Sequence, residues 1–210
     1  MKMDLLRRCF IGIVAFLAFP ALAETTPAPT PAAPLPRVAI ETTAGRIVVE
    51  ADTKRAPITA GNFLRYVDQR RLDGVTFYRV VKVADRFGFV QFGVNGDIKR
   101  VLPPIRHEPT TLTGIHHLDG VLSTPRLAPG TARCDFTIML GDQRASMDAD
   151  PAKRGDNLGY AAFGRVVEGM DVVIKIFDAP DNPGGSIRGA FKGEVPVAPV
   201  RILTARRVKP

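Results

Sequence analysis

Apolar and polar residues repeat with two different periods along this chain. From 37 to 50, apolar positions alternate with polar or small ones on either side of Ala44-Gly45, which predicts a β-hairpin. From Pro57 to about Arg70, apolar residues recur every three or four positions, which predicts an amphipathic helix with proline in its first turn. The segment 170–177 shows the same helical period.

Short apolar runs, separated by stretches rich in glycine, proline and polar residues, fill the rest of the chain. We predict a strand in each run, at 77–83, 87–92, 120–123, 136–140, 160–166 and 200–208. We predict loops at 99–117, 126–133, 142–159 and 178–194. Helices never alternate regularly with strands, so a parallel sheet is not expected. The pattern favours an antiparallel barrel or sandwich with two helices covering its ends.

The N-terminus has the pattern of a secretory signal peptide. Lys2, Arg7 and Arg8 are followed by the apolar run 9–19 and then by Ala21-Leu22-Ala23, a small-residue cleavage site. We therefore expect residues 1–23 to direct export and to be cleaved after Ala23. The apolar run is short for a bilayer span, so a retained anchor is not favoured.

Composition divides the remainder into a linker and one domain. Residues 24–36 are mostly proline, alanine and threonine, which predicts an extended linker. Residues 37–210 are enough for one domain with one core. After cleavage, Cys134 is the single cysteine, so no internal disulfide is expected.

The basic charge does not indicate a nucleic-acid partner. The full chain carries +8, of which about +6 remains after residues 1–23 are removed. The basic residues are scattered and are not interleaved with aromatic residues as in single-strand binders. We interpret them as a solvated surface.

Arg79 is the residue that most needs a chemical explanation, because it stands inside the apolar run Phe77-Tyr78-Arg79-Val80-Val81. Strict alternation puts Arg79 on the same face as Phe77 and Val81. A guanidinium among apolar side chains is costly unless it is paired. It therefore has either a carboxylate partner, for which Asp135 is one candidate, or a ligand.

Other catalytic chemistries lack their residue patterns. The histidines are His107, His116 and His117, and neither His-x-x-x-His nor Cys-x-x-Cys occurs, so no zinc site is expected. The serine-hydrolase elbow, the phosphate loop and the dinucleotide fingerprint are also absent from the sequence. Asp148 and Asp150 lie in a polar stretch and are interpreted as turn residues. We expect neither metal nor cofactor.

Several segments in order resemble the cyclophilin-type peptidyl-prolyl cis-trans isomerases, most closely the exported bacterial ones. They are 43–47, Ala56-Pro57 with Asn62-Phe63, 77–81, 120–123, 135–138 and 163–173. The resemblance implies a mainly β fold, a closed antiparallel barrel of about eight strands capped by two α-helices. It also implies a periplasmic protein that acts on proline-containing polypeptide clients and uses no cofactor. We expect a monomer, because no long exposed apolar stripe is evident in the sequence.

The resemblance implies a site as well, with Arg79 as the catalytic residue. The implied substrate-binding residues are Phe87, Phe89, Gln91, Pro125, Arg126, Asp135, Thr137, Met147 and Tyr160. The insertion 82–86 leaves it open whether Phe87 or Phe89 is the pocket phenylalanine. Isomerisation must lower a barrier of roughly 18–20 kcal/mol, which requires an apolar pocket and a donor but no nucleophile.

Two positions depart from the family pattern, since Thr137 and Ser146 stand where the family usually has aromatic residues. A smaller apolar pocket would grip proline less strongly. Three hypotheses therefore remain. The chain is an exported prolyl isomerase with a weakened or altered pocket, a binding module or chaperone of the same fold with little turnover, or a protein in which Arg79 is purely structural.

Overall fold

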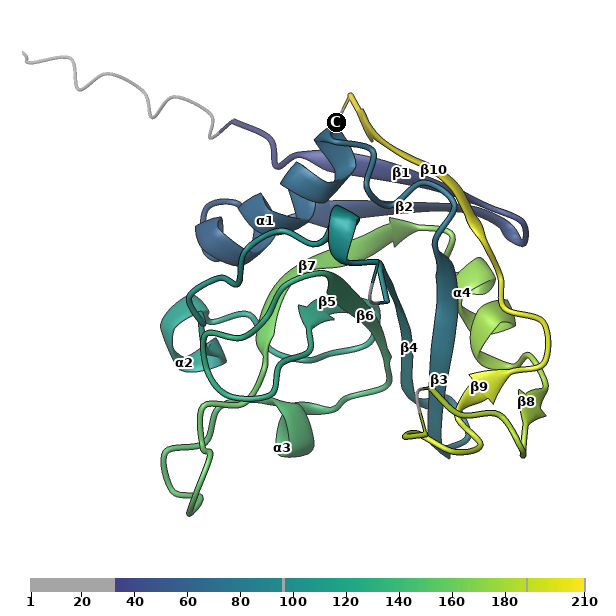
Figure 1. Cartoon of the computed structure of the whole chain (residues 1–210). Helices are drawn as coiled ribbons and strands as arrows, with labels where there is room; N and C mark the ends of the chain where they lie inside the picture. Colours follow the sequence, from purple (N-terminus) through teal and green to yellow (C-terminus); the bar gives the residue numbers. More distant parts are fainter. Residues whose placement is uncertain (1–32, 96, 188, 210) are drawn as a thin grey trace, which may run out of the picture. The chain divides into compact units, whose positions relative to one another are not determined.

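Eight strands form one antiparallel sheet that curls into a barrel in the computed structural model (Figure 1). The structure describes residues 33–95, 97–187 and 189–209, so the predicted signal peptide and most of the predicted linker lie outside the described residues. The strand order is β10-β1-β2-β7-β5-β6-β4-β3. The elements are β1 (Arg37–Thr42), β2 (Gly45–Ala51), α1 (Pro57–Asp68), β3 (Thr76–Ala84), β4 (Phe87–Gly93), η1 (Ile98–Arg100), α2 (Thr110–Thr113), β5 (Val121–Thr124), β6 (Asp135–Leu140), α3 (Arg144–Met147), β7 (Ala161–Glu168), α4 (Met170–Phe177), β8 (Asp181–Asn182), β9 (Val195–Pro196) and β10 (Ile202–Val208).

The mainly β, eight-stranded antiparallel architecture is confirmed, but the barrel is only partly closed. The edge strands β3 and β10 share no continuous ladder, and they meet at an isolated bridge between Thr76 and Arg201. The chain before β10 continues along β3 through separate hydrogen bonds, in which the Phe77 amide donates to the Val200 carbonyl and the Val80 amide donates to the Glu194 carbonyl, both at 2.8 Å.

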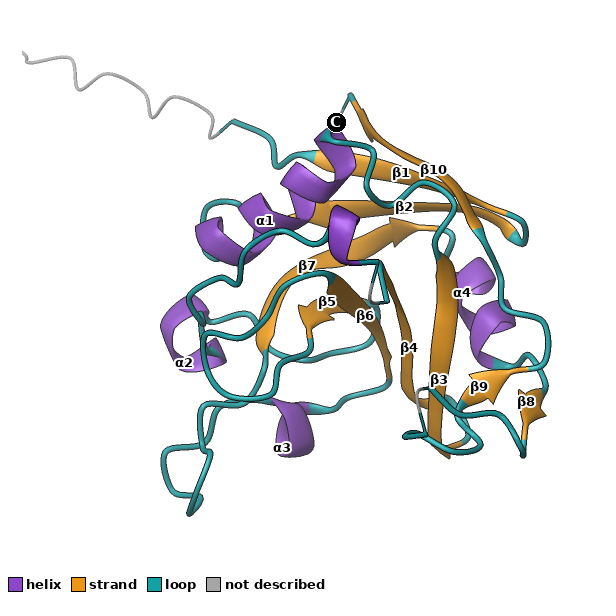
Figure 2. Ribbon diagram, in the orientation of Figure 1, coloured by secondary structure: helices purple, strands orange, loops and turns teal. Residues whose placement is uncertain are grey.

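The two predicted helices are present as α1, which contacts β7 and β10, and α4, which contacts β2, β3 and β4. Figure 2 shows that short helices also interrupt the loops. The stretches 99–117, 142–159 and 178–194 were predicted to be loop throughout, yet they contain most of η1, all of α2 and α3, and the two-residue strand β8. Elements this short are too brief to show a hydrophobic period. No helix among the described residues is both long and apolar enough to span a membrane.

Aromatic rings fill the centre of the barrel and join it to α1. Phe63 of α1 packs edge-on against Phe136 of β6, with ring centroids 5.1 Å apart, and Phe77 of β3 packs on Phe92 of β4 at 5.0 Å. All four rings are fully buried. Aromatic pairs of this geometry stabilise by about 0.5–1.5 kcal/mol beyond the area that they bury.

A distant carboxylate fixes the N-terminus of α1. The cap residue Ala56 offers no side-chain acceptor. Glu108 instead accepts hydrogen bonds from the amide of Ile58 (3.1 Å), the amide of Thr59 (2.7 Å) and the hydroxyl of Thr59 (2.6 Å). Further along α1, Asn62 Nδ2 donates to the carbonyl of Arg133 at 2.7 Å, so the helix also supports the loop before β6.

Candidate active site

A β-bulge in β3 turns Arg79 away from the core. Phe77 pairs with Phe92 and Arg79 pairs with Gln91, so Tyr78 is an extra residue between them. Strict alternation, which put Arg79 on the face of Phe77, was therefore wrong. The bulge leaves Phe77 inside the barrel and places Arg79 on the outer face, and bulges beside functional sites commonly re-aim a side chain in this way.

The strand register then lines up residues across the outer face. Arg79 of β3 lies opposite Gln91 of β4, Gln91 opposite Thr137 of β6, and Thr137 opposite Ser123 of β5. The neighbouring row joins Phe89 and Met139, with Val81 at its end outside the pocket. Paired residues in an antiparallel sheet have Cα atoms about 4.5–5.5 Å apart, so the two rows form a continuous floor.

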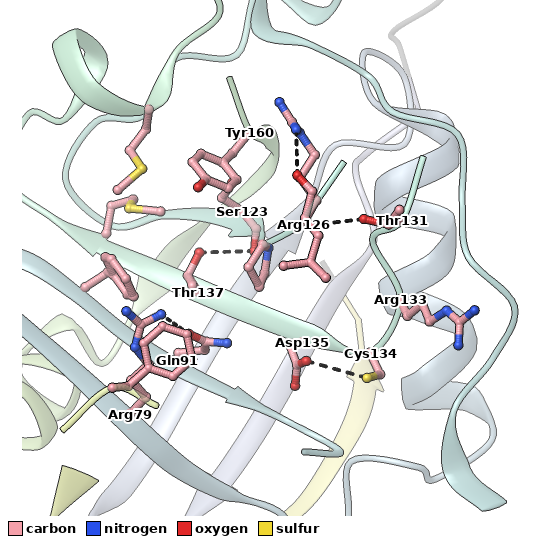
Figure 3. A pocket seen from close by; sticks show the side chains of 16 residues that line it. Arg79, Gln91, Ser123, Arg126, Thr131, Arg133, Cys134, Asp135, Thr137 and Tyr160 are labelled. Carbon is pink, nitrogen blue, oxygen red and sulfur yellow. Dashed lines mark hydrogen bonds between the residues drawn. The ribbon is translucent and has the colours of Figure 1, made fainter. Parts of the chain in front are cut away.

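This floor is the base of a pocket of about 580 Å³, shown in Figure 3. Loops and α3 supply its walls. The lining residues are Arg79, Phe89, Gln91, Ser123, Pro125, Arg126, Leu127, Thr131, Arg133, Cys134, Asp135, Thr137, Met139, Met147, Tyr160 and Phe191.

The pocket contains every predicted site residue except Phe87. The register resolves the choice between the two phenylalanines, because Phe89 lies in the floor beside Met139. Phe87 pairs with Ala84 at the end of the hairpin and lies against Gly141, away from the pocket. Two-residue alternation within 82–92 could not decide this, because both phenylalanines lie on the same face of the strand.

The guanidinium of Arg79 is held by two polar partners and two rings. Nε donates to Oε2 of Glu194 at 2.6 Å, and Nη1 donates to Oε1 of Gln91 at 3.1 Å. The Cζ atom lies 5.3 Å from the ring centroid of Phe89 and 3.8 Å from that of Phe191. The carboxylate partner is thus Glu194 and not Asp135, which the sequence had suggested. Nη2 has no hydrogen-bond partner among the described residues.

Gln91 connects Arg79 to a second buried polar group. Its Nε2 donates to the hydroxyl oxygen of Tyr78 at 2.5 Å, which fixes the orientation of the amide and leaves Oε1 facing Arg79. Burial raises the pKa of Tyr78 strongly, and the neighbouring Asp135 raises it further, so the phenol stays neutral. The Gln91 side chain is itself buried, which limits its alternatives to this arrangement.

His117 stabilises the end of the floor opposite Arg79, at Ser123. His117 is fully buried, and its Nδ1 donates to Oδ1 of Asp148 at 2.6 Å while Nε2 lies 2.8 Å from Oγ of Ser123. Burial lowers the pKa of His117 despite the neighbouring carboxylate, so the ring is neutral and Nε2 accepts from the hydroxyl. Ser123 is almost completely buried, and this network holds β5 against the segment after α3.

Thr137 and Ser146, the two positions that depart from the family pattern, differ in whether they line the pocket. Thr137 lies in the floor, where its hydroxyl donates to the backbone carbonyl of Ser123 at 3.2 Å. Ser146 is exposed and does not line the pocket, and its hydroxyl donates to the carbonyl of Gln143, the N-cap residue of α3. Its neighbour Met147 supplies the apolar side chain at that wall.

Arg126 ties together two loops at the rim. Its guanidinium makes a two-pronged contact with Asp156, at 2.5 and 2.8 Å, and Nε donates to the carbonyl of Gly159 at 2.9 Å. The contact with Arg126 lowers the pKa of Asp156 to about 2. Arg126 also stacks near the ring of Tyr160, at 5.6 Å from the centroid. Its donors are thus engaged within the protein, although the residue lines the pocket.

Sequence reasoning missed the contribution of the loop before β9. Phe191 and Glu194 lie more than 100 residues from Arg79 in a stretch interpreted as loop. The only signal was that a buried arginine requires a carboxylate, and this requirement does not say which one. Cys134 also lines the pocket, but burial, followed by the effect of Asp135, raises its pKa to about 12, so it is not a nucleophile at neutral pH.

The arrangement combines a fixed cationic donor with a largely apolar cavity. The described residues contain no cluster of three or more potential metal ligands. Such a site can bind an uncharged segment and donate a hydrogen bond to it. Ser123, His117 and Asp148 are hydrogen-bonded in series at its edge, but Ser123 is only 1% exposed, so we assign this series a structural role and not that of an accessible nucleophile with its base.

Comparison with known proteins places this geometry in a family. The family model for cyclophilin type peptidyl-prolyl cis-trans isomerases matches residues 37–207. A peptidyl-prolyl cis-trans isomerase of Acinetobacter baylyi is 33% identical over 170 residues, which cover 80% of this chain and 84% of the relative. Peptidyl-prolyl cis-trans isomerase A of Dickeya dadantii is 30% identical over 205 residues, or 95% of each chain.

A solved structure supports the same assignment at the level of the fold. The cyclophilin type isomerase of Cryptosporidium parvum superposes with a TM-score of 0.64 at 18% identity, covering 84% of this chain and 99% of the other. A second structure of that protein, with a TM-score of 0.64, was solved in the presence of the dipeptide Ala-Pro. Taken with the sequence matches, this shows that the chain belongs to the cyclophilin-type peptidyl-prolyl cis-trans isomerases.

Proposed function

We propose that this protein is an exported prolyl isomerase, which speeds the folding of polypeptides in the periplasm by isomerising their X-Pro bonds at the pocket around Arg79. The observation that carries the proposal is the state of the Arg79 guanidinium. Gln91 and Glu194 hold two of its nitrogens, while Nη2, which no described residue binds, is left for a ligand at the edge of an apolar floor.

The chemistry follows from the electronic structure of the amide. As the peptide bond twists, its nitrogen loses conjugation and regains a lone pair, so a donor placed beside it favours the twisted state over the planar one. A guanidinium remains charged at all relevant pH values and presents several N–H groups. Speeding a step of about 100 s to about 1 ms needs roughly 10⁵-fold, or about 7 kcal/mol, from donor and pocket together.

We further propose that the pocket grips proline less tightly than a pocket with an aromatic floor. Thr137 puts a small side chain at the centre of the register row that contains Gln91. Apolar burial contributes about 25 cal/mol per Å², so a missing ring reduces the apolar surface available to proline. This observation favours the second candidate function, a module that binds proline-containing segments with little turnover.

The proposal of export rests on the sequence of residues 1–23, whose charged, apolar and small-residue segments follow the order of a signal peptide. Expression of the full chain in a Gram-negative host with fractionation tests it. The expected result is a periplasmic protein whose N-terminal residue is Glu24, determined by mass spectrometry. A cytoplasmic protein that retains Met1 would contradict export without affecting the isomerase assignment.

The catalytic proposal is tested by a protease-coupled assay on an Ala-Pro peptide. We expect acceleration by the wild type and a loss of about 100-fold or more in kcat/KM for Arg79→Ala, the scale seen when one preorganised donor is removed. Arg144→Ala is a matched control, because Arg144 is an exposed arginine paired with Asp142 outside the pocket. Peptide binding without acceleration would favour the binding module, and full activity in Arg79→Ala would exclude Arg79 from the mechanism.

A further inference from the structure

The loop between β8 and β9 supplies two residues that the sequence motifs did not indicate, Phe191, which lines the pocket, and Glu194, which binds Arg79. We propose that Glu194 is a positioning residue, which orients the Arg79 guanidinium, and that Phe191 is a wall of the proline pocket. The inference rests on the proposed function, in which Arg79 donates to the prolyl amide. It assigns the loop a part in both turnover and substrate binding.

The position of Glu194 is set by the backbone before its charge is considered. Its carbonyl accepts from the amide of Val80, the residue that follows Arg79 on β3, at 2.8 Å. This main-chain contact brings the carboxylate within 2.6 Å of Nε of Arg79. The arginine side chain is only 16% exposed at this point, so the pair is more shielded than an ordinary surface ion pair.

Two contacts on one rigid group determine its plane. Glu194 holds Nε and Gln91 holds Nη1, and because the guanidinium is planar, the direction of Nη2 is then determined. A side chain with this many rotatable bonds would otherwise sample orientations in which it donates to water. Holding the donor where it is needed raises the rate of turnover without requiring Glu194 to touch the substrate.

Phe191 is held beside Arg79 in a conformation that aromatic residues rarely adopt. Its φ is +55°, in the left-handed region, where a residue with a bulky side chain is strained. Backbone hydrogen bonds on either side hold the loop, from the Ile187 amide to the Ala190 carbonyl and from the Gly193 amide to the Gly185 carbonyl. Strain of this kind is typical of sites where geometry serves a function.

The ring of Phe191 presents apolar surface where the floor is small. It is 47% exposed, lines the pocket and stacks over the Arg79 guanidinium at 3.8 Å. An aromatic residue supplied by this loop therefore offsets part of the apolar surface that Thr137 does not provide. A proline ring bound beside Arg79 would contact it, so loss of the ring weakens binding more than it slows turnover.

Substitutions of Glu194 separate contact from charge. Glu194→Gln keeps an oxygen that can accept from Nε but removes the charge, whereas Glu194→Asp keeps the charge but shortens the reach by one methylene. With kcat and KM determined separately for the Ala-Pro peptide, we expect Glu194→Asp to lower kcat by about three- to tenfold with little change in KM, and Glu194→Gln to stay within about twofold of wild type. Asp181→Ala is a matched control, because Asp181 pairs with Lys82 on the same strand.

Phe191→Asn tests the wall, because asparagine tolerates the left-handed conformation and so removes the ring without adding strain. We expect KM to rise by about three- to tenfold with kcat little changed, and Phe191→Tyr to behave as wild type. A fall in KM or a rise in kcat for Phe191→Asn would show that the ring obstructs the site, and would overturn the assignment of Phe191 as a wall of the proline pocket. Equal kcat in Glu194→Asp and Asp181→Ala would overturn the positioning role.

One measurement does not depend on turnover. In NMR spectra, the Nε proton of Arg79 should be slow to exchange in the wild type and in Glu194→Gln, and should lose this protection in Glu194→Asp. Rapid exchange in the wild type would overturn the positioning role even if the enzyme is active. Protection in a wild type without turnover would support the positioning contact while the proposed function fails.

Discussion

Glu108 should control the stability of the whole domain, although it does not line the pocket. Replacing it by alanine removes the acceptor for two amides and one hydroxyl at the start of α1. Thr59 is fully buried, so water cannot easily replace the carboxylate there. The two donors of Thr59 are the buried ones, and unsatisfied buried donors cost about 1–3 kcal/mol each. The lost charge at a helix N-terminus costs about 0.3–1 kcal/mol more, which gives a sum of about 2–7 kcal/mol. We expect Glu108→Ala to lower the free energy of unfolding by about 3–5 kcal/mol.

Urea denaturation followed by far-ultraviolet circular dichroism measures this change, and thermal unfolding should show a fall in Tm of about 6–20 °C for a domain of this size. Glu108→Gln, which keeps one acceptor, should lose about 1–2 kcal/mol. Alanine at the exposed Glu168 should stay within about 0.5 kcal/mol of wild type. A loss below about 1 kcal/mol in Glu108→Ala would refute the reasoning, because it would mean that water satisfies the helix terminus without the carboxylate.

Two further predictions concern the floor of the pocket. Thr137→Phe adds a ring that faces the cavity and not the core. A ring that covers one or two methylenes of proline should lower KM for the Ala-Pro peptide by about 4- to 15-fold, at about 0.8 kcal/mol per methylene. An unchanged KM would show that the floor does not limit binding. His117 has a folded-state pKa below the unfolded value of 6.5, so its contribution to stability is complete above pH 6.5 and falls as the pH drops below it. Free energies of unfolding measured between pH 5 and 8 should show this slope in the wild type and a shallower slope in His117→Gln. Equal slopes in the two proteins would contradict the prediction.

The hydrophobic period was sufficient to locate the elements that bury a continuous stripe. α1, α4 and the long strands were predictable because a buried face leaves a regular repeat in the sequence. Elements of two to four residues, such as α3 and β8, leave no such repeat. The exact face of Arg79 was also hidden, because a bulge changes the alternation by one residue and depends on how two strands pair.

The site was predictable to the extent that it lies on those regular strands. Arg79 could be named because it is a charge inside an apolar run, and Gln91 and Thr137 because their segments resemble those of the family. Phe89 needed only the register of β4 and β6 to be distinguished from Phe87. Phe191 and Glu194 could not be named, because their loop has no repeating pattern and its path is decided by tertiary contacts.

The incomplete closure of the barrel and the state of Arg79 have one structural origin. If β10 paired with β3 along its whole length, the outward amides of β3 would be taken by a regular ladder. Instead β10 meets β3 only near Thr76, and the amide of Val80 is left to bind the carbonyl of Glu194. That single contact brings the carboxylate of Glu194 beside Arg79. A regular neighbouring strand would supply a carboxylate there only if its register placed an acidic residue opposite Arg79. The irregular edge of the sheet therefore provides the carboxylate that offsets the desolvation cost of a guanidinium on this strand.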